Sequence, residues 1–120
     1  MLVVDDERGV REMFRRSLEL ARFDVVVAEG GDAGLRRLRD DPTICLVLLD
    51  LTMPDMSGRA FRDLQRAEPR LAAIPTIVVT GSAIGRAVLE ELMAVDYLRK
   101  PVSREDLVRT VARYCKPAHP

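Results

Sequence analysis

Short apolar runs alternate with amphipathic segments along the whole chain. Five runs have the composition of buried strands, and they cover residues 2–4, 25–28, 44–49, 74–79 and 95–98. Between them, apolar side chains recur at helical spacing over residues 8–21, 33–40, 60–67 and 88–92, and again after residue 103. The pattern therefore predicts a strand–helix pair repeated five times.

Turn and cap signals separate these segments. Gly30-Gly31 breaks the chain before the second helix, and Pro42 and Pro69 end the second and third helices. Ser103 with Asp106 three positions later predicts an N-cap for the last helix. Ala60, Phe61, Leu64 and Ala67 recur at helical spacing and predict the third helix.

The predicted strands are continuously apolar rather than apolar at every second position. Such strands are typical of a parallel sheet that helices cover on both faces. Five strand–helix units are too few for a closed eight-unit barrel. We therefore predict an open, doubly wound α/β sandwich of three layers, with one domain over residues 1–116 and a frayed tail at 117–120.

Charge and composition bear on partners and location. Nineteen basic and nineteen acidic residues cancel, so no overall field attracts nucleic acid or a membrane surface. No apolar run approaches the roughly 20 residues that span a bilayer. Cys45 and Cys115 lie far apart in the sequence, and we expect both to be reduced packing residues of a cytoplasmic protein.

Reactive side chains follow four of the five predicted strands. Asp5 and Asp6 follow the first strand, Asp50 the third, Thr80 the fourth and Lys100 the fifth. In a parallel sheet these strand ends share one edge, where open α/β sheets bind ligands. Crowded carboxylates favour a hard cation, Mg²⁺ or alternatively Mn²⁺. A cation, an ammonium and a hydroxyl around an attacking Asp50 suit phosphoryl transfer.

Each of these groups also has an ordinary structural explanation. Asp6 suits the start of the first helix, and Asp50 suits the cap of a turn. Thr80 and Lys100 suit plain strand-to-loop junctions. Their coincidence at one edge of a parallel sheet is what favours a functional interpretation.

Four segments, residues 3–7, 48–58, 78–81 and 96–101, resemble the receiver domain of two-component response regulators. The most specific parts are the stretch from Asp50 to Gly58, with Met53-Pro54 inside it, and the pair Lys100-Pro101. The resemblance covers essentially the whole chain. It implies a flavodoxin-like, CheY-like sandwich with strand order 2-1-3-4-5.

The resemblance also implies a role for each residue at the edge. Asp50 would accept a phosphoryl group from a phosphohistidine, and Asp6, Asp50 and the carbonyl of Thr52 would bind Mg²⁺. Asp5 would reach the ion mainly through water. Lys100 would pair with the phosphoryl oxygens, and Thr80 would hydrogen-bond to them and move toward them on activation.

Further residues match positions that the family uses for switching. Tyr97 would swing inward as Thr80 moves, although a half-buried strand residue with a wet hydroxyl is the alternative interpretation. Thr52 and Ser82 would tune the lifetime of the phosphoryl group. The Lys100-Pro101 peptide bond is expected to be cis.

The implied partners are a sensor histidine kinase or a phosphotransfer domain, and an output domain or target protein of unknown kind. Direct binding to nucleic acid and insertion into a membrane are not expected, and dimerisation is compatible with the family. The chain would catalyse its own phosphorylation and dephosphorylation, without turnover of a separate substrate. The segment between Thr80 and Lys100 is shorter than the family pattern, so the usual dimer or partner surface is not carried over.

Two other functions use the same fold. A phosphorylation-independent interaction module would not need the acidic residues, Thr80 and Lys100, which are all present. A phosphohydrolase with Asp50 as its nucleophile would typically carry a second acid two residues later, where this chain has Thr52.

Overall fold

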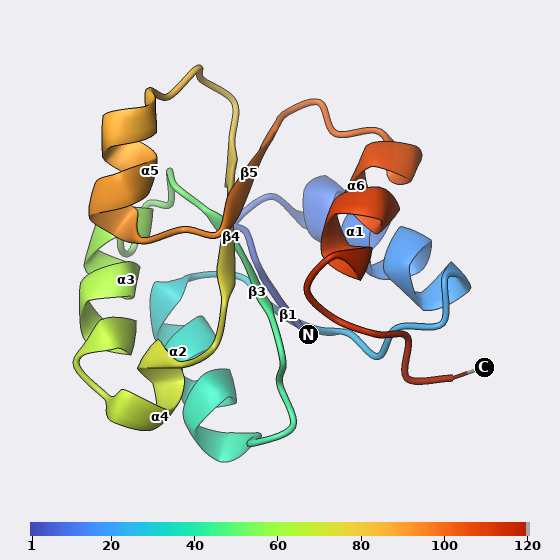
Figure 1. The fold of residues 1–120 in the computed structure, drawn as a ribbon, viewed down its shortest axis with the longest axis horizontal. Helices are drawn as coiled ribbons and strands as arrows, with labels where there is room; N and C mark the ends of the chain where they lie inside the picture. The colour runs from blue at the N-terminus through green and yellow to red at the C-terminus, as the bar shows by residue number, and fades with distance from the viewer. Residues whose placement is uncertain (120) are drawn as a thin grey trace.

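The apolar runs form a parallel sheet in the order β2-β1-β3-β4-β5 (Figure 1). The computed structural model describes residues 1–119. Its strands are β1 (Leu2–Val4), β2 (Val26–Ala28), β3 (Val47–Asp50), β4 (Thr76–Thr80) and β5 (Asp96–Arg99). Its helices are α1 (Arg8–Leu20), α2 (Gly31–Asp40), α3 (Gly58–Arg66), α4 (Pro69–Ala72), α5 (Arg86–Leu92) and α6 (Arg104–Ala112). The doubly wound fold and the strand order are therefore confirmed.

Successive residues of the strands serve two opposite helical layers. Val3 belongs to the core that includes Phe14 and Leu107, beneath α1 and α6. Val4 belongs to the core that includes Leu35 and Phe61, beneath α2 and α3. Alternation of side chains along a strand explains why both faces need apolar residues. Although β1 has only three residues, it pairs with both β2 and β3 and is an interior strand of the sheet.

The region of the third predicted helix differs from expectation. Helix α3 ends at Arg66, and a further short helix, α4, begins with Pro69 at its first turn. Leu64 is 44% exposed, whereas Arg62 and Gln65 are buried. The prediction that Leu64 lies on the inner face is wrong, because two polar side chains with buried hydrogen-bond partners occupy that face.

Serine side chains cap the two helices that follow β3 and β5. Ser103 Oγ accepts a hydrogen bond of 3.1 Å from the Asp106 N–H, which confirms the predicted N-cap of α6. Ser57 Oγ accepts one of 3.1 Å from the Ala60 N–H at the start of α3. Each serine satisfies a backbone donor that the helix leaves unpaired.

The cysteines form a disulfide, so the expectation that both are reduced is wrong. Cys45 and Cys115 are 70 residues apart in sequence, yet their sulfur atoms lie 2.12 Å apart. Cys45 precedes β3 and Cys115 follows α6. In a doubly wound fold, strand starts and helix ends lie at the same edge of the sheet, which we call the amino edge. Topology therefore joins two cysteines that sequence distance seemed to separate.

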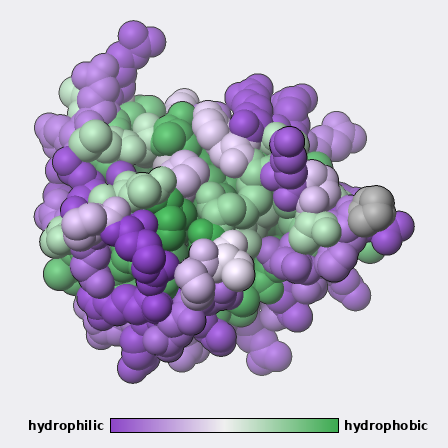
Figure 2. Space-filling model, turned by 60° about the horizontal axis from the view of Figure 1, so that its bottom comes forward, coloured by the Kyte–Doolittle hydropathy of each residue, from purple (hydrophilic) through white to green (hydrophobic). Residues whose placement is uncertain are grey.

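Ala118 and His119 also lie at the amino edge. The N–H groups of Ala118 and His119 donate hydrogen bonds to the Arg22 carbonyl, and His119 Nε2 lies 2.9 Å from Asp24 Oδ1. Pro120 lies outside the described residues, so the expected fraying of the tail stays a prediction. Figure 2 turns this edge forward and shows apolar atoms in the centre with hydrophilic side chains around them.

Among residues 1–119, no helix is both long enough and apolar enough to cross a membrane.

Candidate functional site

Four strand ends meet at the carboxyl edge of the sheet, opposite the amino edge. Asp5 follows β1, and Asp50 and Thr80 are the last residues of β3 and β4. Lys100 follows β5, and its N–H donates a hydrogen bond of 2.8 Å to the Thr80 carbonyl. Because β1, β3, β4 and β5 are consecutive neighbours in the sheet, side chains from distant parts of the sequence share one edge.

Lys100 links the two buried carboxylates at this edge. Its Nζ lies 2.9 Å from Asp5 Oδ2 and 3.8 Å from Asp50 Oδ1, and it is also 3.5 Å from Glu7 Oε1. Asp5 and Asp50 are both buried, whereas the Lys100 side chain is 18% exposed. The ammonium therefore sits at the mouth of the site, with the carboxylates beneath it.

Asp6 completes a cluster of three carboxylates. One carboxylate oxygen from each of Asp5, Asp6 and Asp50 lies within 4.8 Å of the other two. Asp6 is exposed and the other two are buried, so the cluster opens to solvent on the Asp6 side. Oxygen atoms at this spacing suit a hard divalent cation better than a soft one. This gathering of the acidic residues was predicted from the strand ends.

The electrostatics of the cluster are unfavourable without a cation. Burial, and then the negative charge of Asp5, raise the pKa of Asp50 to about 6, while the Thr52 N–H and the Lys100 charge act in the opposite direction. Burial opposes the charge of Lys100, but the hydrogen bond and charge of Asp5 outweigh it and raise the pKa of the ammonium. One lysine does not neutralise three carboxylates, so the site fits an added positive charge.

The loop from residue 51 to residue 57 holds Asp50 in place. The Thr52 N–H donates a hydrogen bond of 3.3 Å to Asp50 Oδ1, and the Gly58 N–H donates one of 3.0 Å to the Leu51 carbonyl. A Cβ atom on Gly58 would lie 2.7 Å from Leu51 Cα, so only glycine permits this approach of the helix start to the strand end. Thr52 itself is exposed beside the cluster.

Two residues that support the site were not identified from the sequence. Arg11 Nη1 donates a hydrogen bond of 2.8 Å to the Asp5 carbonyl. The Asp55 carboxylate accepts hydrogen bonds of 3.4 Å from the N–H groups of Gly31 and Asp32, which ties the loop after β3 to the start of α2. Helical spacing indicates neither contact, because each one joins different elements.

The residues proposed for switching lie on or directly after strands β4 and β5. Thr80 is buried, and its Oγ1 accepts a hydrogen bond of 3.1 Å from the Ser82 N–H. Ser82 is exposed. Tyr97 is 42% exposed on β5, opposite Val78 of β4. The Lys100-Pro101 peptide bond is cis, as expected.

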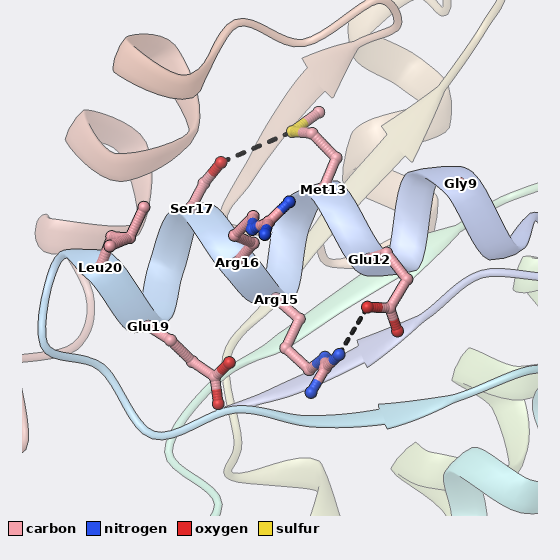
Figure 3. A pocket seen from close by; sticks show the side chains of 8 residues that line it. All are labelled: Gly9, Glu12, Met13, Arg15, Arg16, Ser17, Glu19 and Leu20. Carbon is pink, nitrogen blue, oxygen red and sulfur yellow. Dashed lines mark hydrogen bonds and ion pairs between the residues drawn. The ribbon is translucent and has the colours of Figure 1, made fainter.

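A separate hollow of about 710 Å³ lies on α1, away from the cluster (Figure 3). A single helix provides all of its lining, so it is a groove on the surface. The carboxylate of Glu12 pairs with Arg15 across it. It has neither the buried carboxylates nor the strand ends of the carboxyl edge, which remains the candidate site. The lining residues are Gly9, Glu12, Met13, Arg15, Arg16, Ser17, Glu19 and Leu20.

Fold and site together define a doubly wound α/β domain with a carboxylate cluster and a lysine at the carboxyl edge. The model of the response regulator receiver domain family matches residues 1–112. The chain therefore belongs to the receiver domain family of two-component response regulators.

Curated relatives extend beyond the region that they share with this chain. Transcriptional regulatory protein CpxR of Escherichia coli (strain K12) is 35% identical over 99% of this chain and 50% of its own length. Phosphate regulon transcriptional regulatory protein PhoB of Klebsiella pneumoniae is 36% identical over 92% of this chain and 49% of its own length. The chain thus spans about half the length of these relatives.

Solved structures agree with the fold. Chemotaxis protein CheY4 of Vibrio cholerae is 26% identical, with a TM-score of 0.87 over 95% of this chain and 96% of its own. A response regulator receiver protein from Pseudomonas putida is 33% identical, with a TM-score of 0.85 over 93% of both chains.

Proposed function

We propose that this chain is a phosphoacceptor receiver in which Asp50 takes a phosphoryl group from a phosphohistidine. A carboxylate oxygen of Asp50 attacks phosphorus, the bond between phosphorus and the imidazole nitrogen breaks, and the imidazole leaves with the electron pair of that bond. The product is an acyl phosphate. The observation that carries the proposal is the Asp5–Lys100–Asp50 arrangement, with separations of 2.9 and 3.8 Å at the mouth of the central strands.

The nucleophile must be ionised to attack. With a pKa of about 6, most Asp50 side chains carry a negative charge at pH 7. Any added positive charge at the cluster increases that fraction further. The Thr52 N–H, 3.3 Å from Asp50 Oδ1, orients one carboxylate oxygen and directs the other toward the donor.

The proposed cofactor is Mg²⁺, with Mn²⁺ as an alternative. Asp6, Asp50 and the Thr52 carbonyl would hold it, and Asp5 would contact its hydration shell. When bound, the ion supplies charge neutralisation for the phosphoryl oxygens. Lys100, whose Nζ lies 2.9 Å from Asp5 Oδ2 and 3.8 Å from Asp50 Oδ1, would pair with the phosphoryl oxygens.

Thr80 provides the link to a conformational response. Its hydroxyl accepts a hydrogen bond from the Ser82 N–H and still has its own proton to donate. An arriving phosphoryl group adds three strong acceptors, which draw the Thr80 hydroxyl toward Asp50. That movement pulls on the segment that leads to α5, and Tyr97 on β5 turns inward in the proposed active state. Thr52 and Ser82, both exposed beside the site, control the access of water that hydrolyses the acyl phosphate.

The proposed partners follow from the same chemistry. The phosphoryl donor is a sensor histidine kinase or a phosphotransfer domain, and the proposed location is the cytoplasm. Relatives such as CpxR are transcriptional regulators of twice this length, so an output domain or a separate target protein receives the signal, with dimerisation as one route. Phosphorylation and dephosphorylation of Asp50 are the reactions that the chain catalyses, and no other substrate is turned over.

The proposal is tested with a small-molecule phosphodonor. Acetyl phosphate with Mg²⁺ adds one phosphoryl mass to the wild-type chain and to Asp63→Asn, an exposed control on α3, but not to Asp50→Asn. Intact-mass spectrometry and a magnesium titration read the result. Equal modification of wild type and Asp50→Asn contradicts the proposal, and absence of magnesium binding favours a phosphorylation-independent interaction module instead.

A further inference from the structure

Helix α5 is attached to the body of the domain in an unusual way. It has seven residues, and Leu92 is its one buried side chain. Met93, which follows it, is 59% exposed. A helix this short is unstable alone and normally depends on an apolar face. Since α5 buries so little apolar surface, other contacts must hold it.

A buried arginine makes two of those contacts, and the exposed pair of Arg59 and Glu91, 2.8 Å apart, makes another. Arg62 on α3 is 4% exposed, and its Nε donates a hydrogen bond of 2.8 Å to the Leu92 carbonyl. Its Nη2 donates one of 3.1 Å to the Met93 carbonyl. The last carbonyls of a helix lack partners within the helix and carry its negative dipole end, so a guanidinium suits them in both geometry and charge.

The same guanidinium also binds the inside of the sheet. Arg62 Nη1 donates hydrogen bonds of 2.8 Å to Gln65 Oε1 and 3.1 Å to Thr76 Oγ1. Gln65 is fully buried, and its amide donates to the carbonyls of Leu71 and Ile74. One side chain therefore connects α3, β4 and the end of α5 through a network of polar contacts.

No carboxylate balances this buried charge within residues 1–119, since the ion pairs there do not include Arg62. Burial lowers the pKa of its guanidinium, and Arg66 adds to that effect, yet an arginine remains charged at neutral pH. Backbone carbonyls, an amide and a hydroxyl alone compensate the charge. Hydrogen bonds are directional, so these contacts fix the carboxyl end of α5 in position. The helix can then tilt about that end more readily than it can turn about its own axis.

The elements that Arg62 joins also connect to the carboxyl edge of the sheet. Helix α3 begins at Gly58, which bonds to Leu51 directly after Asp50. Thr76 and Thr80 are the first and last residues of β4. The far end of α5 is reached from Thr80 through residues 81–85, where a change at the phosphoryl site arrives first.

We propose that Arg62 is a positioning residue that anchors the carboxyl end of α5, so that α5 pivots at Met93 when the Thr80 segment moves. This proposal rests on the proposed phosphorylation of Asp50. Met93 has the left-handed backbone conformation, with φ of 53°, and the Arg62 contacts lie on its own carbonyl and on that of the preceding residue. The pivot is therefore fixed, and the amino end of α5 is the part that moves.

The first test measures the anchor without phosphorylation. Arg62→Met keeps the aliphatic stem and removes all donors, while Arg62→Lys keeps the charge and removes the fork. Hydrogen exchange of residues 87–93 rises by about 10-fold or more in Arg62→Met and rises less in Arg62→Lys. Arg66→Met, an exposed control on the same helix with one bond of 3.4 Å to the Glu91 carbonyl, stays close to wild type.

Equal hydrogen exchange of residues 87–93 in the wild type and both Arg62 variants contradicts the proposal that Arg62 anchors α5. If Arg62→Met does not fold, the comparison of Arg62→Lys with Arg66→Met decides. Exchange in β1 and β3 distinguishes local release of α5 from general destabilisation, because only the latter increases exchange throughout the sheet.

The second test measures coupling, with Mg²⁺ and beryllofluoride as the phosphoryl mimic. In the wild type, amide resonances at Asp50, Lys100 and α5 all shift. In Arg62→Met, those at Asp50 and Lys100 still shift, while the α5 response falls below half that of the wild type, and Arg62→Lys restores part of it. An undiminished α5 response in Arg62→Met overturns the inference. Absence of any shift at Asp50 in the wild type overturns the proposed phosphorylation instead, and the exchange measurement alone then decides the anchor.

Discussion

The two edges of the sheet are stabilised by different chemistry. At the carboxyl edge, Asp5, Asp50 and Lys100 form a charged cluster, and burial together with the negative charge of Asp5 raises the pKa of Asp50 to about 6. At the amino edge, a disulfide joins Cys45 to Cys115, and Arg62 joins three elements through neutral acceptors. The carboxyl edge keeps unbalanced charge available for a ligand, whereas the amino edge satisfies its groups internally.

The carboxyl edge therefore serves the chemistry of the domain, and the amino edge serves its stability. Like charges held close together are costly unless a ligand neutralises them, so such a cluster indicates a function. A disulfide and satisfied hydrogen bonds lower the free energy of the folded state without any ligand. We therefore expect damage at the amino edge to affect unfolding first, and damage at the carboxyl edge to affect phosphorylation first.

The largest expected effect is on stability at the amino edge. Opening the Cys45–Cys115 disulfide, which spans 70 residues, frees the unfolded chain and costs about 4 kcal/mol, or on the order of 15 °C in Tm. Thermal unfolding with and without reductant measures it. The double variant Cys45→Ser, Cys115→Ser should unfold at the reduced wild-type temperature and ignore reductant. A Tm of the oxidised protein that reductant leaves unchanged contradicts the prediction.

The sequence predicted these two edges unequally. Strand ends follow from apolar runs, and the motif from Asp50 to Gly58 and the pair Lys100-Pro101 marked the carboxyl edge. The amino edge has no such signal, because topology alone brings Cys45 to Cys115.

Helix α3 illustrates the same limit. Its periodicity favoured Leu64 as an inner residue, but the inner position went to Arg62, whose partners at Thr76 and Leu92 lie on other elements. The burial of a polar side chain on a helix can be predicted only when its tertiary hydrogen-bond partners are known.

A large effect on chemistry is expected at the carboxyl edge. Lys100→Gln removes the one ammonium beside Asp5 and Asp50 and slows phosphorylation by acetyl phosphate about 100-fold. Lys116→Gln, at the only other lysine in the sequence, is the control and retains the wild-type rate. The rate of acyl phosphate formation, followed by intact mass, checks this. A Lys100→Gln rate within a few-fold of wild type would mean that the ammonium does not assist the transfer.

A moderate effect on both stability and phosphorylation is expected at Gly58, beside the loop that follows Asp50. Gly58→Ala forces a Cβ atom to 2.7 Å from Leu51 Cα, so the loop that orients Asp50 must shift, at a cost of about 1–3 kcal/mol. Phosphorylation slows as well. Gly9→Ala is the control, because a Cβ there meets nothing within 4 Å. Chemical denaturation gives the stability, and equal stability of the two variants would show that the loop yields easily.

The smallest effect concerns pH in the absence of metal. The pKa of Asp50 is raised from 3.8 to about 6 in the folded state, so the folded state binds the proton more tightly than the unfolded state does. Ionisation of Asp50 therefore costs stability above about pH 6, and this cost disappears as the pH falls through 6 toward 4. With EDTA present, Asp50→Asn is more stable than wild type near pH 7, and the difference shrinks near pH 5.

Thermal unfolding of both chains across this range measures the difference. Mg²⁺ should stabilise the wild type and reduce the advantage of Asp50→Asn at pH 7. A difference between the chains that does not change with pH would show that the charge of Asp50 is already neutralised by its neighbours.

The central claim is that Asp50 accepts the phosphoryl group, and mapping the modified residue tests it most directly. After treatment with Mg²⁺ and acetyl phosphate, borohydride reduces an acyl phosphate to an alcohol, which peptide mass spectrometry then locates. The account predicts homoserine in place of Asp50 and unmodified Asp5, Asp6 and Asp55. Modification at another residue, or none in the folded, magnesium-loaded chain, would contradict it.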